Sequence, residues 1–297
     1  MTHYQLVASN KRKSVLVVFF FLVFIGLASY AMAIGFGYGL DMVGMALVLA
    51  GGFSFASYWW SDKIILGLSK AKPANRSQHF DFYTVAENLS SSQRMPMPKL
   101  YVIEDTAMNA FATGRSPEKA VVCATTGLLS RLNRSEIEGV IAHELSHVKN
   151  YDMLLMSLVT ILVGFLSLLA DWMMRSSFGR RGRDKSDNQL QVIFMVAGIV
   201  LALLSPLIAN LIKLAISRRR EFLADASGVA MTKNPQGLIN ALTKIGQDKQ
   251  PLEAANKATA HLYISNPLKN SKNAAGWFSK MFMTHPPVAE RVEALRG

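Results

Sequence analysis

The sequence predicts a mainly α-helical, multi-pass membrane protein that also carries an α+β domain with a small sheet. Three observations predict it: the 297 residues are 51% hydrophobic and only 18% charged, the apolar residues lie in long uninterrupted runs, and short strand-like stretches lie between those runs. This apolar content excludes a disordered chain, and a single cysteine excludes a disulfide framework. The formal charge of +12 suits nucleic acid or an anionic membrane, and the runs favour the membrane over nucleic acid.

Four runs are long enough to cross a bilayer, because a helix needs about 20 apolar residues to span a hydrocarbon core of about 30 Å. They are residues 14–40, 42–61, 153–170 and 188–212. The second run ends in Tyr58, Trp59 and Trp60, an aromatic cluster typical of the membrane interface. Buried core helices are the alternative, and this alternative weighs most for the third run, which is the shortest.

The distribution of lysine and arginine predicts the orientation of the runs. Lys11, Arg12 and Lys13 precede the first run, and basic residues also follow the second, so the first two runs form a hairpin with both ends in the cytoplasm. The arginines at 218–220 are interpreted as positive charge at the same membrane surface. The loop between the third and fourth runs is also basic, which does not suit the outer side. Either this second pair crosses against the rule, or it enters the bilayer without fully crossing.

The polar segments on either side of the second pair of runs are each short for a domain, so we expect them to pack together. Residues 99–104 and 120–125 are rich in β-branched and aromatic side chains and predict two strands. Residues 109–114 lie between them. The three segments therefore predict a small hairpin or sheet.

One helix carries residues with metal-binding chemistry. Ser135 begins a capping-box pattern, S-E-I-E, and apolar residues follow it at helical spacing. His143 and His147 are four residues apart in an H-E-x-x-H pattern, so both imidazoles reach one ion at about 2.0–2.1 Å. Glu144 is rotated by about 100° from His143 and is expected to face a metal-bound water instead of the ion. Gly139, one turn earlier, is expected to leave room beside the imidazoles.

A catalytic zinc site needs a third protein ligand and one open position. The candidate ligand is Glu221, which follows the fourth run closely, just as His147 precedes the third. The intervening membrane pair returns the chain to the side that it left, and so joins the two halves of the site. Asp225 lies one turn after Glu221, and we assign it to accept the second N–H of His143. Charge balance for the neighbouring arginines is the alternative role of both acids.

Three motifs together closely resemble the HtpX-type membrane zinc metalloproteases: H-E-L-S-H at 143–147, S-R-R-R-E-F-L-A-D at 217–225 and N-A-F-A-T-G at 109–114. The four apolar runs add to this resemblance, which extends from Lys11 to Val292. The family comprises bacterial heat-shock proteases, which are related to the CAAX prenyl endopeptidases and belong to the gluzincins.

The resemblance implies a gluzincin-type protease domain that binds one zinc ion per subunit through His143, His147 and Glu221. It also implies that Glu144 is the catalytic acid and base. The implied substrates are polypeptides, in the quality control of misfolded membrane proteins during stress. The implied location is the bacterial inner membrane, with the active site facing the cytoplasm.

Zinc and Glu144 together predict hydrolysis of peptide bonds. Zinc lowers the pKa of its water towards about 7, and Glu144 moves the proton of that water to the leaving amine. The developing oxyanion needs a further donor, for which His285 is the candidate and Arg291 the second choice. A turn residue before two prolines is the alternative for His285.

Proteases often bind substrate as an added strand on an exposed sheet edge. The candidates for that edge are Asn109, Ala110, Phe111 and Ala112, which the resemblance supports more than their composition does. An ordinary turn is the alternative for this segment. Cys123 is interpreted as a buried small hydrophobe.

The runs and motifs divide the chain into five parts. These are a cytoplasmic N-terminus (1–13), a transmembrane hairpin (14–61), the first part of the catalytic domain (62–152), a second membrane hairpin (153–212) and the second part of the catalytic domain (213–297). A prenyl-peptide endopeptidase is one rival interpretation. Another is a non-catalytic zinc-binding scaffold or sensor, which would have no need of Glu144. A transporter would want ionisable residues inside its spans, and the four runs contain none.

Overall fold

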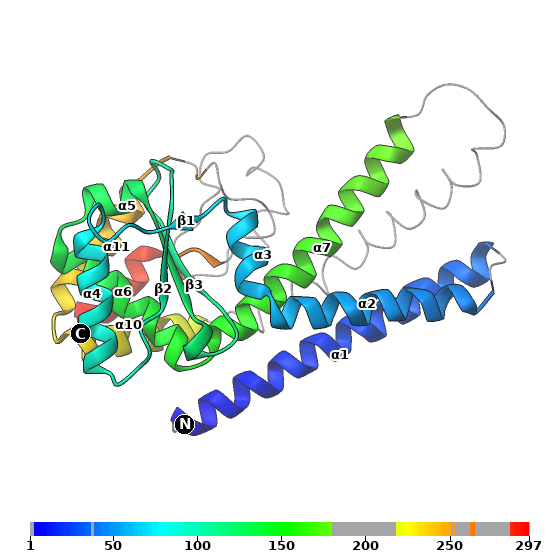
Figure 1. The fold of residues 1–297 in the computed structure, drawn as a ribbon, viewed down its shortest axis with the longest axis horizontal. Coiled ribbons are helices and arrows are strands. Elements are labelled where there is room, and N and C mark those ends of the chain that lie inside the picture. The colour runs from blue at the N-terminus through cyan, green and yellow to red at the C-terminus, as the bar shows by residue number, and fades with distance from the viewer. Residues whose placement is uncertain are drawn as a thin grey trace.

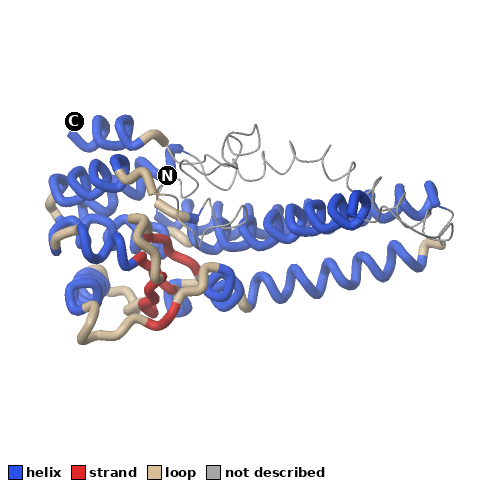
Figure 2. Tube along the Cα trace, turned by 90° about the horizontal axis from the view of Figure 1, so that it is seen from above, coloured by secondary structure: helices blue, strands red, loops and turns tan. Residues whose placement is uncertain are grey.

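The computed structural model describes residues 3–36, 39–179, 218–250, 252, 262–264 and 286–296. In this part of the chain, three long helices project from a head of strands and shorter helices (Figure 1). The long helices are α1 (His3–Phe36), α2 (Asp41–Trp59) and α7 (Asp152–Gly179). They pack against one another along one side of the molecule, and Figure 2 shows the same separation of helices and head from above.

The first two long helices correspond to the first two predicted runs. Val7–Tyr30 in α1 and Asp41–Trp59 in α2 are each long and apolar enough to cross a membrane. Their apolar side chains face outward, for example Val48, which is 75% exposed, and Phe19, which is 56% exposed. A surface of this kind needs an apolar covering, which a bilayer provides.

The third run, residues 153–170, lies in the first part of α7. Its early side chains are buried within the protein, including Met153, Leu155 and Val159, where α7 meets α1, α2 and α3 (Ser61–Leu68). The start of this run is therefore buried within the protein. Up to Leu166, α7 has the length and hydropathy of a further span only together with the helix before it, from which it is bent by 85°. The fourth run lies outside the described residues.

The head contains one four-stranded sheet and a set of helices. Its remaining elements are β1 (Lys72–Pro73), α4 (Phe80–Ser92), β2 (Lys99–Ile103), β3 (Ala110–Thr113), η1 (Pro117–Lys119), β4 (Val121–Thr125), α5 (Thr126–Arg131), α6 (Arg134–Lys149), α10 (Arg218–Thr232), α11 (Pro235–Gln247) and α13 (Val288–Arg296). The strand order is β1-β2-β4-β3, with β2 and β4 parallel and the outer strands antiparallel to their neighbours. The predicted strands at 99–104 and 120–125 are confirmed, and the segment between them supplies the edge strand β3.

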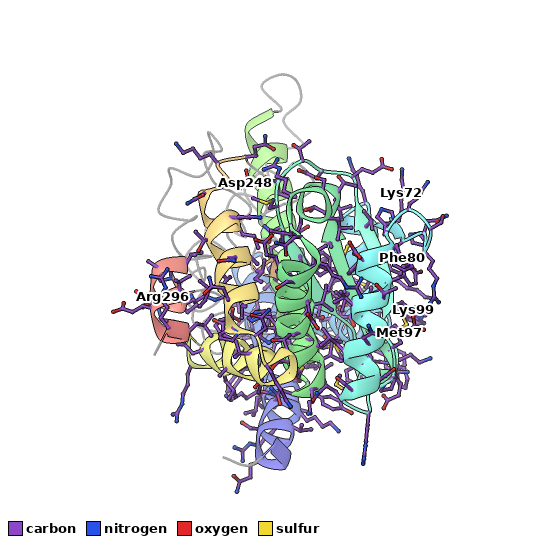
Figure 3. All side chains as sticks on the ribbon, turned by 90° about the vertical axis from the view of Figure 1, so that its left-hand side faces the viewer. Lys72, Phe80, Met97, Lys99, Asp248 and Arg296 are labelled. Atoms are coloured by element: carbon purple, nitrogen blue, oxygen red, sulfur yellow. The ribbon has the colours of Figure 1, made fainter. Side chains whose placement is uncertain are left out.

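Helix α6 lies in the middle of the head, between α4, α10, α11 and β3. Figure 3 views the head from the end opposite the long helices, with Phe80 of α4 on one side and Arg296 of α13 on the other. Two glycines let the neighbouring backbones touch. A Cβ on Gly139 would lie 2.7 Å from the backbone nitrogen of Leu238, and one on Gly228 would lie 3.0 Å from that of His143. The room expected beside Gly139 is thus filled by α11.

The sequence predicted Ser135 as the N-cap of α6, which is wrong by two residues. Asn133 is the N-cap: its side chain accepts from the backbone N–H of Glu136, and the Glu136 side chain accepts from the backbone N–H of Asn133. The Ser135 hydroxyl instead accepts a hydrogen bond from the Asn234 side chain at 3.0 Å. Asn133 therefore caps α6, whereas Ser135 links α6 to the start of α11.

Candidate metal centre

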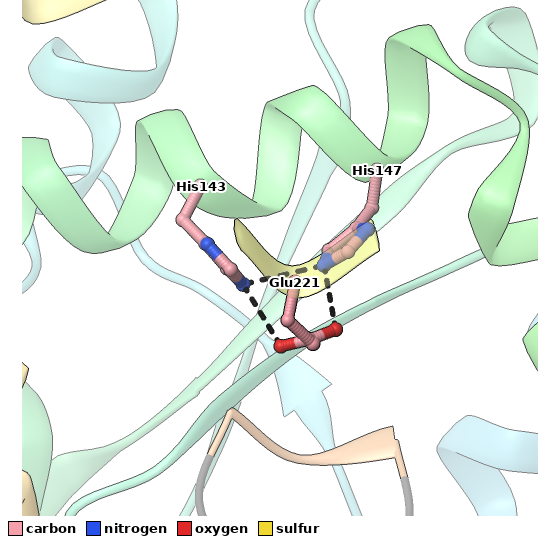
Figure 4. Close-up of side chains that lie close together, drawn as sticks. All are labelled: His143, His147 and Glu221. Atoms are coloured by element: carbon pink, nitrogen blue, oxygen red, sulfur yellow. Dashed lines mark hydrogen bonds and ion pairs between the residues drawn. The ribbon is translucent and has the colours of Figure 1, made fainter. Parts of the chain in front are cut away.

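Two helices that are distant in sequence bring three potential ligands together (Figure 4). The Nε2 atoms of His143 and His147 on α6 are 3.2 Å apart. Glu221 on α10 places its carboxylate oxygens 3.8 Å from the first nitrogen and 3.5 Å from the second. Ligands of a tetrahedral ion held at about 2.0–2.1 Å are about 3.3 Å from each other. The three side chains are buried and fit such an ion in both spacing and chemistry.

Each imidazole is oriented by its own carboxylate. Asp225 Oδ1 lies 2.8 Å from Nδ1 of His143, and Asp152 Oδ2 lies 3.1 Å from Nδ1 of His147. A proton on each Nδ1 leaves the Nε2 lone pair for an ion. The contact of Asp225 with His143 agrees with the assignment from sequence. The contact of Asp152 was missed, although an acid five residues after His147, just past the end of its helix, was a usable signal.

Asp225 is held in turn by Arg291 from α13. The guanidinium donates two hydrogen bonds to this carboxylate, from Nε at 2.8 Å and from Nη2 at 2.6 Å, and a third to the carbonyl of Ile264 at 3.2 Å. Burial opposes ionisation of Asp225, but hydrogen bonds from Arg291 and His143 outweigh it and lower the pKa of the carboxyl to about 2. Arg291 thus binds Asp225, contrary to its suggested role as an oxyanion donor. The other candidate donor, His285, lies outside the described residues.

Asp152 connects the site to the first long helix. Asn10 on α1 donates to Asp152 Oδ1 at 2.6 Å and to the carbonyl of Asn150 at 2.9 Å. Arg220 approaches the same carboxylate at 3.6 Å, and its side chain is only 10% exposed. The interpretation of Arg220 as a surface charge is therefore wrong, because it lies beside the carboxylate that orients His147. Sequence spacing contains no signal for the Asn10 contact, which joins residues 142 positions apart.

The charges around this site are unbalanced without a cation. The buried or nearly buried charged side chains are the carboxylates of Glu144, Asp152, Glu221 and Asp225 and the guanidiniums of Arg220 and Arg291. Burial opposes protonation of His147, but the hydrogen bond to Asp152 and the nearby carboxylates raise its pKa to about 9. When both histidines are neutral, as binding of an ion requires, four negative and two positive groups leave a formal charge of −2. Uncompensated buried charge is costly, and one divalent cation would neutralise this group. The charge count supports the same conclusion as the spacing of the ligands.

The segment predicted to bind substrate forms the edge strand beside α6. The carbonyl of Asn109 accepts a hydrogen bond from the backbone N–H of Thr125 on β4. Backbone groups of successive residues in a strand point to opposite sides, so those of Ala110 and Ala112 point away from β4, to the free edge. The backbone N–H of Ile264 already bonds to the carbonyl of Ala110 at 3.0 Å. Phe111 packs edge-on against Tyr263 with ring centroids 5.1 Å apart. The 262–264 segment therefore lies against one end of this edge.

Glu144 is buried on α6 and lies towards the sheet. Burial raises the pKa of the Cys123 thiol on β4, and the nearby charge of Glu144 raises it further. Cys123 is fully buried, in agreement with its interpretation as a small core residue. The charge of Glu144 also acts on His147 and Arg291, so this carboxylate lies close to the candidate ligands as well as to the sheet.

The chain is similar to known proteases over its whole length. Residues 78–297 match the family model described as peptidase family M48. Proteins named "Protease HtpX homolog" from Streptococcus uberis and Thermoanaerobacter pseudethanolicus are each 40% identical, over 99% and 100% of this chain and 99% and 98% of their own length. One from Dictyoglomus turgidum is 41% identical over 99% of this chain and 94% of its own.

A crystal structure of S. mikatae Ste24p is similar over 98% of this chain and 66% of its own, with 18% sequence identity and a TM-score of 0.48. That likeness is too slight to support the assignment, which rests on the sequence matches. The sequence matches to proteases agree with the buried group of two histidines and one glutamate and with the two apolar helices. The chain belongs to peptidase family M48, as a membrane-associated metalloprotease of the HtpX type.

Proposed function

We propose that the chain is a zinc endopeptidase whose ion is held by His143, His147 and Glu221. The observation that carries this proposal is the buried group of three ligands in which each imidazole is oriented by a separate carboxylate. Two imidazole nitrogens and one carboxylate oxygen are a donor set that suits catalytic zinc, with a fourth position left for water. Asp225 and Asp152 then set the tautomer and raise the basicity of the two histidines.

The chemistry divides between the ion and the protein. When bound, zinc supplies a Lewis acid that acidifies water and polarises the scissile carbonyl. Glu144 accepts the proton of the attacking water and delivers it to the leaving amine, as a general base and then a general acid. A second donor to the developing negative charge remains necessary, and His285 is still our candidate for it. Arg291 keeps Asp225 ionised and so helps to orient His143, and its guanidinium also lies 3.9 Å from the carboxylate of Glu221.

For the substrate we propose an extended polypeptide that adds to the free edge of β3. Asn109, Ala110, Phe111 and Ala112 form the binding segment, and Ala112 directs its backbone groups to that edge. Recognition through backbone groups places little demand on the substrate sequence. This suits cleavage of misfolded or damaged membrane proteins in stress-related quality control.

For the location we propose the bacterial inner membrane, with the head and its active site in the cytoplasm. Lys11, Arg12 and Lys13 follow Asn10, which contacts Asp152, and Lys11 itself contacts Tyr151. The start of α1 and the end of α2 both lie at the head (Figure 1), so this basic segment is on the side of the active site. The catalytic domain is then composed of residues 62–152 and 213–297. Residues 153–212 form the second membrane hairpin between its two parts.

The test of this function is the substitution Glu144→Gln, with Glu138→Gln as its matched control on the same helix. We expect the purified Glu144 variant to retain one zinc per chain but to cleave casein about 10²–10⁴-fold more slowly. The control should cleave like the wild type, because Glu138 is partly exposed and lies outside the ligand group. Cleavage by the wild type should stop with a chelator and return with zinc. Undiminished cleavage by the Glu144 variant would eliminate it as the base.

A further inference from the structure

A cavity of about 670 Å³ opens where the three long helices meet the head. Its volume lies within the roughly 300–1,000 Å³ that is usual for pockets that bury small molecules. Apolar side chains from all three helices form most of its wall, among them Val15 and Phe19 of α1, Phe55 of α2 and Leu154 of α7. The cavity is thus apolar on the side of the helices that cross the membrane.

The end of the cavity next to the head carries positive charge. Lys11 and Arg115 line it, and no acidic residue is among the lining side chains. The Lys11 ammonium lies 4.5 Å from the centre of the Tyr151 ring, and the Arg115 guanidinium lies 4.0 Å from that of Trp59. These aromatic contacts hold both cations at this end of the cavity, and Glu118, whose charge interacts with Lys11, does not line the cavity. This end is suited to an anionic group.

One polar atom in the wall has no hydrogen-bond partner among the described residues. The hydroxyl of Ser54 is buried, its residue is only 4% exposed, and it makes no hydrogen bond with the described residues. Ser14, which also lines the cavity, differs in that its hydroxyl donates to the backbone carbonyl of Asn10 at 2.9 Å. A buried hydroxyl normally has a hydrogen-bond partner. An occupant with an acceptor oxygen beyond its charged end would satisfy Ser54.

We propose that this cavity binds one anionic phospholipid. Lys11 and Arg115 contact the phosphate, Ser54 donates to an ester oxygen, and an acyl chain lies along Val15 and Phe19. The cavity is charged at the end next to the protein head and apolar towards the membrane. A phospholipid has the same order, from its charged phosphate to its acyl chains. A helical polypeptide segment satisfies its own backbone groups and offers no reason for two cations and an unpaired hydroxyl.

The position of this lipid links it to the metal centre. Tyr151 and Leu154 of the cavity wall flank Asp152, whose carboxylate contacts His147. Tyr151 has a φ of 59°, a left-handed conformation that an aromatic side chain rarely adopts. Lipid in the cavity would therefore support the turn between α6 and α7 from its membrane side.

The head-group contacts are tested with delipidated full-length protein in neutral detergent, titrated with phosphatidylglycerol or phosphatidylcholine and followed by native mass spectrometry. We expect phosphatidylglycerol to bind about tenfold more tightly or better, a preference of about 1.4 kcal/mol. The double substitution Lys11→Gln and Arg115→Gln should remove that preference. Arg12→Gln should retain it, because Arg12 is exposed on the same helix and does not line the cavity. Equal binding of both lipids by the wild type would overturn the proposal, as would a preference that survives the double substitution.

The apolar contacts are tested by filling the cavity. A Cβ on Gly51 would meet nothing within 4 Å, and Gly51 lines the cavity, so Gly51→Leu adds volume where the acyl chain is placed. Gly52→Leu is the matched control, since it has equal space but is outside the lining. We expect the first variant to lose phosphatidylglycerol binding at least tenfold and the second to bind like the wild type, with thermal unfolding used to verify that both are folded. Equal binding by the two variants would show that the lipid lies elsewhere.

Discussion

The distance between α6 and α10 should determine the metal affinity, and Gly228→Ala tests this directly. The added Cβ would lie 3.0 Å from the backbone nitrogen of His143 and 3.3 Å from its Cα, both of which are rigid backbone atoms. Restoring ordinary contact requires α10 to move outward by about 0.4 Å, at a cost of about 1–3 kcal/mol in packing. Better helix propensity returns up to about 1 kcal/mol of this.

The same movement carries Glu221 away from the histidines. Its oxygens lie 3.5 and 3.8 Å from the two Nε2 atoms, and the shift would take them towards about 4 Å, whereas a tetrahedral ion requires about 3.3 Å. We therefore expect zinc affinity to fall at least about tenfold, measured by competition with a chromogenic chelator. Gly67→Ala on α3 is the control, since its Cβ meets nothing within 4 Å. A Gly228 variant that is folded and binds zinc like the wild type would refute the reasoning.

Two further outcomes are expected. Asn10→Ala removes the 2.6 Å hydrogen bond to Asp152, so zinc affinity should fall about tenfold because His147 is less firmly oriented. Arg12→Ala is the control and should leave zinc affinity unchanged. Equal affinities of the two variants in the chelator assay would exclude the role of Asn10. Cys123 should react with a maleimide only after unfolding, since burial raises the pKa of its thiol and removes it from solvent; rapid labelling of the native protein, followed by mass spectrometry, would contradict this.

The unreactive Cys123 has a practical use. Single cysteines introduced between residues 176 and 186 should then be the only thiols that react with a membrane-impermeant reagent in the native protein. Labelling from each side of intact membranes tests whether the second membrane pair fully crosses. This experiment also tests the proposed cytoplasmic side of the head.

The candidate histidine ligands on α6 were predictable because they depend on local spacing, and Glu221 was predicted from its position just after the fourth apolar run. His143 and His147 share a helical face at a separation of four residues, and Asp225 follows Glu221 at the same separation. The segments that form β2, β3 and β4 were also predicted from the sequence. Their order in the sheet was not, because it depends on the pairing of β2 with β4, which leaves β3 at the edge. The capping residue was misplaced by two positions, because Asn133 and Ser135 both satisfy the local pattern and only the contact with Asn234 separates them.

The amino-acid sequence alone determined that this protein has helices long and apolar enough to cross a membrane and a metalloprotease motif, because both follow from the period and length of local patterns. The partners that hold the site came only from the tertiary structure. Arg291 reaches Asp225 across 66 positions, and Asn10 reaches Asp152 across 142. A hydrogen bond between distant residues depends on how whole helices pack, and here that packing depends on the absence of a side chain at Gly228.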